Sequence, residues 1–310
     1  MTMNKAEEYF LGIDVGGTHL KIGLVSKSGK IISFEKIDTA PYRDDPKGFN
    51  HRFLEGMGGI LAKFPDVKKV GIGLPGLISK DRKTTLEIPA IPALNGFPLK
   101  EELKKKYGHI SFFLENDAAA AAIGEYRFGK NNPPENFLFI TMGTGIGSAL
   151  VIDGQIFKGC RGNAMEMGHM LSRGNQGLET LIGRNGILRI LDRFIQAYPR
   201  LVGELENKEL GTHLLVDTAK TGNEISLMVF EEVGRILGEA IVSTIRILDV
   251  TNVYFGGGIS AGLEFMMPAM EKTVRQYLTA YYTKDLNLMK ATLENNAGTL
   301  GAAALCFLED

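Results

Sequence analysis

The chain has 310 residues, of which 44% are hydrophobic and 23% are charged, and its formal net charge is −1. This balance is typical of a globular protein, and it excludes the strongly basic surface that binds nucleic acids or anionic membranes. The length exceeds the size at which a single hydrophobic core usually divides, so we expect two domains.

The features that govern cellular location predict a cytoplasmic protein without membrane association. The first ten residues, MTMNKAEEYF, contain acidic side chains where a signal peptide would have a positive segment and an apolar run. No apolar stretch approaches the length of a transmembrane helix. Cys160 and Cys306 are the only cysteines, so no disulfide framework is predicted.

Residues 10–26, FLGIDVGGTHLKIGLVS, predict a strand, a glycine turn and a second strand. Asp14 ends the first strand with a charge, and Thr18 adds a hydroxyl group after the turn. Gly16 and Gly17 can adopt positive φ and let a ligand approach the backbone closely. Such a turn can bind phosphate while the acid holds a cation. Alternatively, it is a hairpin in which the glycines serve only the turn.

Apolar periodicity, end signals and glycine–proline punctuation predict the further elements of the chain. The expected strands are residues 31–37, 69–74, 111–114, 252–255 and 286–292. The expected helices are residues 47–64, 99–107, 118–128, 184–198, 223–248 and 299–308, and Asn223 is a plausible N-cap.

Gly71, Gly73 and Gly76 match the G-x-G-x-x-G fingerprint of dinucleotide-binding proteins. That fingerprint requires a helix that begins at its last glycine. The residues that follow, LISKDRKTTLEIP, form a polar segment without helical periodicity. We therefore interpret the match as accidental and do not predict NAD binding.

Asp117 lies between a predicted strand and the alanine-rich helix that follows it. An acid at this position commonly caps the helix or stabilises its first turn. The same position also suits a general base, because a carboxylate there can accept a proton from a substrate hydroxyl group.

Residues 137–152, FLFITMGTGIGSALVI, repeat the pattern of residues 10–26. Thr141, Gly143 and Thr144 stand where the first stretch has Asp14, Gly16 and Gly17. Two matching units indicate a duplicated architecture. They favour phosphate binding over a role limited to the turn.

Two further segments contain candidate binding residues. Glu166 and His169, three residues apart in a glycine-rich region, could hydrogen-bond a polyol, although an unrelated surface pair is the commoner explanation. The triplet Gly256, Gly257 and Gly258 follows a predicted strand and would let the backbone approach a flat or charged ligand.

Taken together, five stretches resemble those of the ROK family of sugar kinases, which has the actin-like ATPase fold. The stretches are GIDVGGTHLKIGL, GIGLPGLIS, LENDAAAAAIGE, TMGTGIGSALVIDG and NVYFGGGIS. The resemblance implies an α/β protein with a two-domain actin-like ATPase (ribonuclease H-like) fold and a central cleft. It implies a small sugar-side domain, residues 1–116 completed by the helix 297–310, and a large nucleotide-side domain, residues 117–296.

The resemblance also implies a role for each candidate residue. Asp117 matches the catalytic base, and Asp14 would face magnesium and the phosphates. The residues that match sugar contacts are Gly76, Asn95, Asn116, Asp117, Glu166, His169 and Glu179. The residues that match the ATP segments are Asp14, Gly16, Gly17, Thr18, Thr141, Gly143, Thr144, Gly145, Gly256, Gly257 and Gly258.

The chain departs from the family in one segment. Many members bind a structural zinc ion with cysteines in this region, where the present chain has SRGNQGLE at residues 172–179. Without a thiolate this site cannot form, so we predict no zinc. The altered spacing makes Glu179 the weakest of the implied sugar contacts.

The resemblance implies an ATP- and magnesium-dependent hexose kinase, acting on the 6-OH of glucose, and a homodimer. Alternative acceptors are an N-acylhexosamine, such as N-acetylmannosamine or N-acetylglucosamine, and fructose. A sugar-responsive repressor would need a DNA-binding segment, and only nine residues precede Phe10. A non-catalytic sugar-binding protein would not need Asp117 beside two phosphate turns.

Overall fold

The computed structural model describes residues 8–206 and 208–308. The amino-terminal segment that bears on a signal peptide therefore lies largely outside the described residues. The chain forms two compact units, which are described separately below. The first unit comprises the described residues within Met1–Glu135, Ala149–Met165 and Thr292–Asp310, and the second comprises Asn136–Ser148 and Glu166–Ala291. The domain boundary at residue 116/117 stays a prediction.

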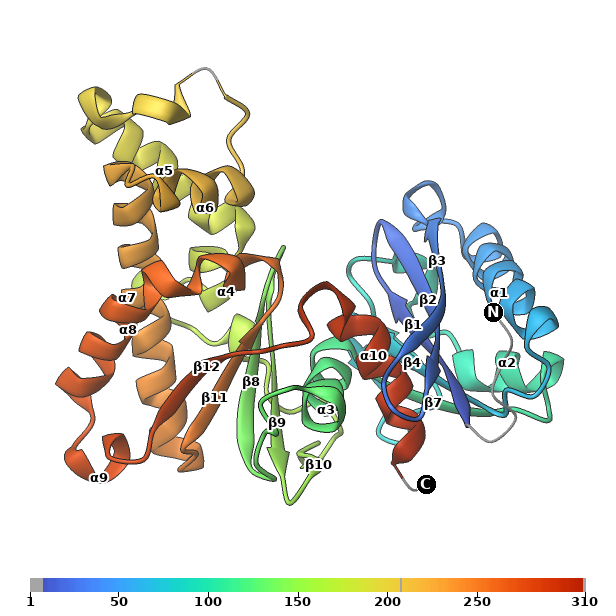
Figure 1. The fold of residues 1–310 in the computed structure, drawn as a ribbon. Coiled ribbons are helices and arrows are strands. Elements are labelled where there is room, and N and C mark those ends of the chain that lie inside the picture. The colour runs from blue at the N-terminus through green and yellow to red at the C-terminus, as the bar shows by residue number, and fades with distance from the viewer. Residues whose placement is uncertain (1–7, 207, 309–310) are drawn as a thin grey trace. The chain divides into compact units, whose positions relative to one another are not determined.

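The first unit is built on a five-stranded mixed sheet (Figure 1). The strand order is β3 (Ile31–Asp38), β2 (His19–Ser26), β1 (Tyr9–Val15), β4 (Lys69–Leu74) and β7 (Ser111–Asn116). Strands β1, β2 and β3 pair antiparallel, whereas β1, β4 and β7 pair parallel. A parallel arrangement needs helices on both faces of the sheet.

Helices cover both faces of this sheet. Successive side chains of β1 point to opposite faces and pack against different helices. Leu11, Ile13 and Val15 belong to a core that includes Phe53 of α1, whereas Phe10 packs on the opposite side against the C-terminal helix α10. The helices of the first unit are α1 (Pro46–Lys63), α2 (Leu99–Lys106), α3 (Asp117–Phe128) and α10 (Ala297–Ala304). Its short elements are the hairpin strands β5 (Leu77–Ile78) and β6 (Thr85–Glu87) and 3-10 turns at Ala40–Tyr42, Pro92–Leu94, Glu294–Asn296 and Leu305–Phe307.

The second sheet repeats the strand order of the first. Its strands are β10 (Gln155–Ile156), β9 (Ile146–Ile152), β8 (Phe137–Met142), β11 (Asn252–Gly256) and β12 (Asn287–Lys290), in that order. As in the first sheet, the last three strands of this order pair parallel. The duplicated architecture predicted from residues 10–26 and 137–152 is therefore confirmed.

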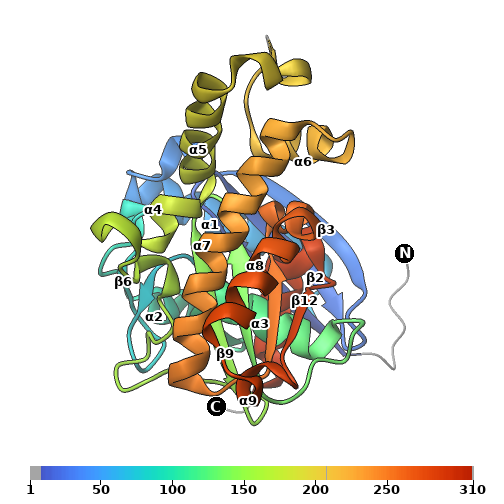
Figure 2. The same ribbon diagram turned by 90° about the vertical axis from the view of Figure 1, so that its left-hand side faces the viewer.

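The helices of the second unit include the longest helix of the described chain, α7 (Figure 2). They are α4 (Leu178–Ile182), α5 (Arg184–Ala197), α6 (Thr212–Lys220), α7 (Glu224–Leu248), α8 (Leu263–Tyr277) and α9 (Ala280–Thr283), with 3-10 turns at Met167–His169, Arg173–Asn175, Pro199–Leu201, Gly203–Leu205 and Gly258–Gly262. The predicted N-cap is confirmed, because the Asn223 side chain accepts the N–H of Ser226 at 3.0 Å. Helices α7 and α8 pack closely: a Cβ on Gly234 would lie only 2.2 Å from the Met266 carbonyl oxygen.

Glycines allow α10 to approach the first sheet at backbone contact distance. A Cβ on Gly12 of β1 would lie 2.1 Å from the Thr299 carbonyl oxygen, and one on Gly71 of β4 would lie 1.8 Å from that of Ala302. The same helix meets α3 where Gly301 faces Gly124, whose Cβ would lie 2.6 Å from the Gly301 Cα. Gly71 is thus required by helix packing, as expected if the match to the dinucleotide fingerprint is accidental.

Within the described ranges, every helix falls short of the combined length and apolar character that crossing a bilayer requires.

We expect Gly71→Ala to destabilise the protein strongly, because its methyl group would overlap the backbone of α10. Overpacking of this kind typically costs about 1–3 kcal/mol or more. Gly59→Ala is the matched control, since a Cβ at Gly59 in α1 meets nothing within 4 Å. Alanine is the better helix former by roughly 0.5–1 kcal/mol, so this control should hold or raise the stability. Urea unfolding of both variants measures the difference, and equal stabilities would contradict the packing described here.

Candidate active site

The carboxyl ends of three parallel strands bring candidate residues of the first unit into one row. Asp14 of β1 lies opposite Gly73 of β4, which in turn lies opposite Glu115 of β7. Neighbouring strands are about 4.8 Å apart, so Asp14 and Glu115 are separated by about 10 Å. Clefts at the carboxyl ends of parallel strands commonly bind ligands in α/β proteins. The row therefore marks a candidate site.

Asp117 is the first residue of α3 and adjoins this row. The position that a Cβ on Gly73 would occupy lies 3.7 Å from the Asp117 Cα. The N-cap of α3 is Asn116, whose Oδ1 accepts the N–H groups of Ala118 and Ala119 at 3.0 and 3.2 Å. Asp117 is the acid of the first turn, and its Oδ1 accepts the Ala118 N–H at 2.7 Å. Asn116 is therefore the N-cap of α3, and Asp117 has the other structural role, that of an acid in the first turn.

Asp14 is held from two sides within the first unit. Its Oδ2 lies 3.0 Å from Lys21 Nζ, and the two residues face each other across β1 and β2. On the other side, the first turn of α10 is so close that a Cβ on Gly298 would lie 2.3 Å from Asp14 Oδ2. The Asp14 side chain remains 18% exposed. Its carboxylate is therefore fixed in place yet accessible.

The first glycine loop (residues 16–18) is shaped by contacts rather than by unusual backbone angles. Neither Gly16 nor Gly17 uses the positive φ that glycine permits. Gly17 instead permits a close approach, since a Cβ there would lie 3.1 Å from the Ala90 carbonyl oxygen. The Gly16 N–H donates to the His19 carbonyl at 3.0 Å, and Thr18 is exposed.

Gly76, Asn95 and Asn116 are linked by the segment that follows β4. Gly76 has a φ of 93°, and a Cβ there would lie 2.3 Å from the Glu87 carbonyl oxygen. Asn116 Nδ2 donates to the Gly76 carbonyl at 3.3 Å. Asn95 is exposed, and its Oδ1 accepts the Ile88 N–H at 2.7 Å. Gly76 therefore contacts Asn116, the N-cap of α3, whereas Asn95 stabilises the loop in which it lies.

In the second unit, the second glycine loop (residues 143–145) lies beside the glycine triplet. Thr141 of β8 is opposite Gly256 of β11. Gly257, with a φ of 82°, passes so close that a Cβ would lie 2.3 Å from the Met142 carbonyl oxygen. Gly258 is exposed. The structure thus brings the two predicted ATP segments of this unit together.

The second glycine loop is anchored to α4 and α5. The Arg184 N–H donates to the carbonyls of Gly143 and Thr144 at 3.2 and 3.3 Å. Glu179 Oε2 accepts the Ile146 N–H at 2.9 Å, and Gly145 leaves the room that this carboxylate needs. The Gly143 N–H donates to the Gly145 carbonyl at 2.9 Å, so it is already used within the loop. A phosphate at this loop would have to be bound by other backbone N–H groups.

Glu166, His169 and Glu179 form a second cluster within the second unit. His169 Nε2 lies 3.9 Å from Glu166 Oε2, and these side chains are 75% and 42% exposed. Partial burial raises the pKa of Glu166, the nearby charge of Glu179 raises it further, and His169 opposes the shift. His169 and Glu179 therefore both lie close enough to act on the charge of Glu166.

An ion-pair network holds the hairpin between His169 and Glu179. Arg173 Nε lies 2.7 Å from Glu239 Oε2, and Arg173 Nη1 lies 3.1 Å from Glu232 Oε1, both on α7. The residues of this hairpin are those at which cysteines would be expected in zinc-binding members of the family. Sequence reasoning missed the network, because a lone arginine in a polar loop gives no signal of its partners.

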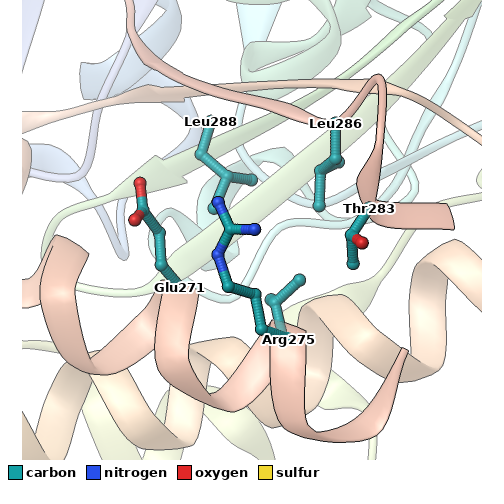
Figure 3. A pocket seen from close by; sticks show the side chains of 6 residues that line it. Glu271, Arg275, Thr283, Leu286 and Leu288 are labelled. Carbon is teal, nitrogen blue, oxygen red and sulfur yellow. The ribbon is translucent and has the colours of Figure 1, made fainter. Parts of the chain in front are cut away.

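Two hollows in the second unit differ greatly in size. One, of about 660 Å³, has a lining that begins at Ser260, two residues after the glycine triplet, and includes Met267 and Lys290. The other lies between α8, α9 and β12, where Arg275 projects beside Glu271 and Leu288 (Figure 3). At about 40 Å³ it is too small for a sugar or a nucleotide. Only the larger hollow is a candidate ligand site.

No group of three or more histidine, cysteine or acidic side chains in the described part of the chain has a metal-binding arrangement. Asp14 remains a candidate for magnesium, because Mg²⁺ is commonly held by one or two carboxylates together with substrate phosphates and water.

Comparison with known proteins identifies the family. A model of the ROK family matches residues 10–308. The chain belongs to the ROK family. The predictions of a ROK-family sugar kinase and of the α/β actin-like ATPase fold are therefore confirmed.

Three relatives illustrate the similarity. Glucokinase from Thermotoga maritima is 31% identical, over 95% of this chain and 96% of its own. The structure of a provisionally assigned sugar kinase from Cytophaga hutchinsonii is 39% identical, with a TM-score of 0.90 over 96% of this chain and 99% of its own. The ROK glucokinase from Streptomyces griseus, solved with glucose and AMPPNP, is 26% identical, with a TM-score of 0.80 over 96% and 99%.

We expect Glu179→Gln to lower the pKa of Glu166, because it removes the neighbouring negative charge. His169→Ala should raise that pKa further, because it removes the opposing cation. NMR titration of carboxyl-labelled glutamates measures both shifts, and Asp285→Asn is the control because the Asp285 charge does not act on Glu166. An unchanged Glu166 pKa in Glu179→Gln would contradict the proximity of the two carboxylates.

Proposed function

We propose that this ROK-family sugar kinase transfers the γ-phosphoryl group of ATP to a hexose hydroxyl, with the 6-OH of glucose as the first candidate. The observation that carries the proposal is the position of Asp117. It is the first residue of α3, at the carboxyl end of β7 and next to the row that contains Asp14. A carboxylate there suits proton transfer beside a phosphoryl group.

Asp117 would accept the hydroxyl proton as the sugar oxygen attacks phosphorus. A general base of this kind must lie within hydrogen-bond reach of the hydroxyl group. The Ala118 N–H donates to the Asp117 carboxylate at 2.7 Å and holds it at the start of α3. Gly76, Asn95 and Asn116 would contact the sugar from the same unit.

The nucleotide would be held by both glycine loops, by Thr141 and by the triplet Gly256–Gly258. The hollow of about 660 Å³, whose lining begins at Ser260 after the triplet, has a size and a partly apolar lining that suit an adenosine group. Asp14 would hold magnesium together with the ATP phosphates. When bound, the ion offsets the negative charge of the transferring group.

Glu166, His169 and Glu179 would orient the sugar ring through its hydroxyl groups. The proximity of these side chains supports this role, since His169 Nε2 lies 3.9 Å from Glu166 Oε2 and Glu179 is close enough to act on Glu166. The proposal also includes a homodimer, by resemblance alone, which light scattering of the purified protein would decide.

The first test is a coupled assay with MgATP and a panel of hexoses. We expect turnover with glucose to exceed turnover with N-acetylmannosamine, N-acetylglucosamine and fructose. A preference for one of the other sugars would change the acceptor but keep the reaction class. Activity with no sugar would contradict the function, and sugar binding without ATP turnover would favour a regulator.

The second test is Asp117→Asn, which keeps the size of the side chain and removes the base. We expect kcat to fall at least about a hundredfold, the lower range for general-base catalysis. Asp45→Asn is the matched control, because Asp45 also accepts a backbone N–H at a helix start, from Lys47 at 3.1 Å in α1. An Asp117→Asn enzyme with the kcat of the control would exclude Asp117 as the base.

A further inference from the structure

Glu115, two residues before the proposed base, has a buried charge. Glu115 is 3% exposed, and its partner Arg82 is 9% exposed. The two side chains form a two-point ion pair, with Arg82 Nε 3.1 Å from Glu115 Oε2 and Arg82 Nη2 2.9 Å from Oε1. Charges withdrawn from water in this way are costly unless their other polar atoms are satisfied.

The remaining hydrogen bonds of the pair go to the backbone of three separate segments. Arg82 Nη1 donates to the Ile78 carbonyl at 3.4 Å, and Nη2 donates to that of Gly162. Glu115 Oε1 accepts the N–H of Asn116 at 3.0 Å. The pair thus connects the segment after Gly76, the residues around Gly162 and the start of α3.

Residues 158–163, here called the docked loop, have two further attachments. Lys158 Nζ lies 3.5 Å from Glu115 Oε2. The amide of Asn163 pairs with the backbone of Ile78, accepting its N–H at 3.0 Å and donating to its carbonyl at 2.9 Å. All of these residues belong to the first unit. The docked loop is therefore fixed to the carboxyl end of β7 and to β5.

Stability alone does not explain this arrangement. Replacing a buried ion pair with apolar side chains of similar volume is often neutral or stabilising. Arg82 also has a φ of 55°, a left-handed conformation that is unfavourable for a residue with a Cβ. The presence of a charged pair with these costs needs another explanation. Its hydrogen bonds to Ile78, Gly162 and Asn116 suggest that it sets the geometry of the acceptor site.

We propose that Arg82 and Glu115 are positioning residues of the acceptor site. They fix the segment after Gly76 and the docked loop relative to Asn116 and Asp117. The inference rests on the proposed function, because Asp117 is taken as the base. Asn116 is held at its N–H by Glu115, and its side chain donates to the Gly76 carbonyl. A shift of this backbone would move the base away from the acceptor hydroxyl group.

The decisive experiment compares Arg82→Met with the double variant Arg82→Met/Glu115→Leu. The single variant leaves a buried carboxylate without its main partner, so its Tm should fall. The double variant removes both charges, so its Tm should return toward that of the wild type. If the pair positions the site, kcat/KM for the sugar should remain at least about tenfold below wild type, because small misplacements cost up to about a hundredfold. The KM for ATP should stay within about twofold.

A spin label on Cys160 gives a readout that does not depend on activity. Cys160 lies in the docked loop and is exposed, whereas Cys306 is buried, and burial raises the pKa of its thiol. A thiol reagent should therefore label Cys160 alone. The label should be more mobile in the double variant than in wild type. Lys63→Met is the control, because it breaks only the exposed pair with Glu35 at 3.1 Å and should change nothing.

A folded double variant with wild-type kcat/KM, or with an unchanged Cys160 spectrum, would overturn the proposal. If both methionine variants fail to fold, Arg82→Lys decides in their place, because it keeps the charge but loses the two-point fork. It should raise the KM for the sugar severalfold, and an unchanged KM would overturn the proposal. If the wild type phosphorylates no sugar, the proposed function fails, while the Cys160 spectra still show whether the pair holds the docked loop.

Discussion

The arrangement of the first unit depends on backbone-to-backbone contact between α10 and the sheet. Gly12 and Gly71 have no side chains to separate them, so the helix lies directly on β1 and β4. The same approach brings the first turn of α10 against Asp14 and, through Gly301, sets the distance to α3. The positions of Asp14 and Asp117 therefore depend on glycines that let α10 pack closely against the sheet and α3.

The two sheets share one strand order but differ chemically at equivalent positions. Asp14 is the penultimate residue of β1, and Thr141 stands at the matching place in β8. A carboxylate suits the handling of a cation or a proton, while a hydroxyl group next to the second glycine loop avoids repelling phosphate oxygens. The duplication therefore supplies two similar frames, and the proposed function assigns the cation and the proton to the first and most of the nucleotide to the second.

The sequence indicated most elements, because strand runs and the Asn223 cap are local signals. Helices α4, α6, α8 and α9 were missed. The first three each start after a glycine that offers no capping side chain, and α9 has only four residues. The close approach of Gly17 to Ala90 could not be predicted, because the two residues are remote in sequence. Arg82 and Glu115 are 33 residues apart, one in a polar loop and one at the end of a strand, so their pairing could not be predicted from local sequence. Asp117, by contrast, could be proposed from its place between strand and helix.

The position of α10 has a consequence for biosynthesis. Its residues follow every strand of both sheets in the chain, yet they complete a core whose first strand begins at Tyr9. Domains generally fold as units during translation, amino-terminal parts first. Here the leading part of the nascent polypeptide cannot complete one face of its sheet until residues 297–304 have left the ribosome. The second unit, whose residues are complete by Ala291, can therefore reach its native state before the unit that precedes it in the chain.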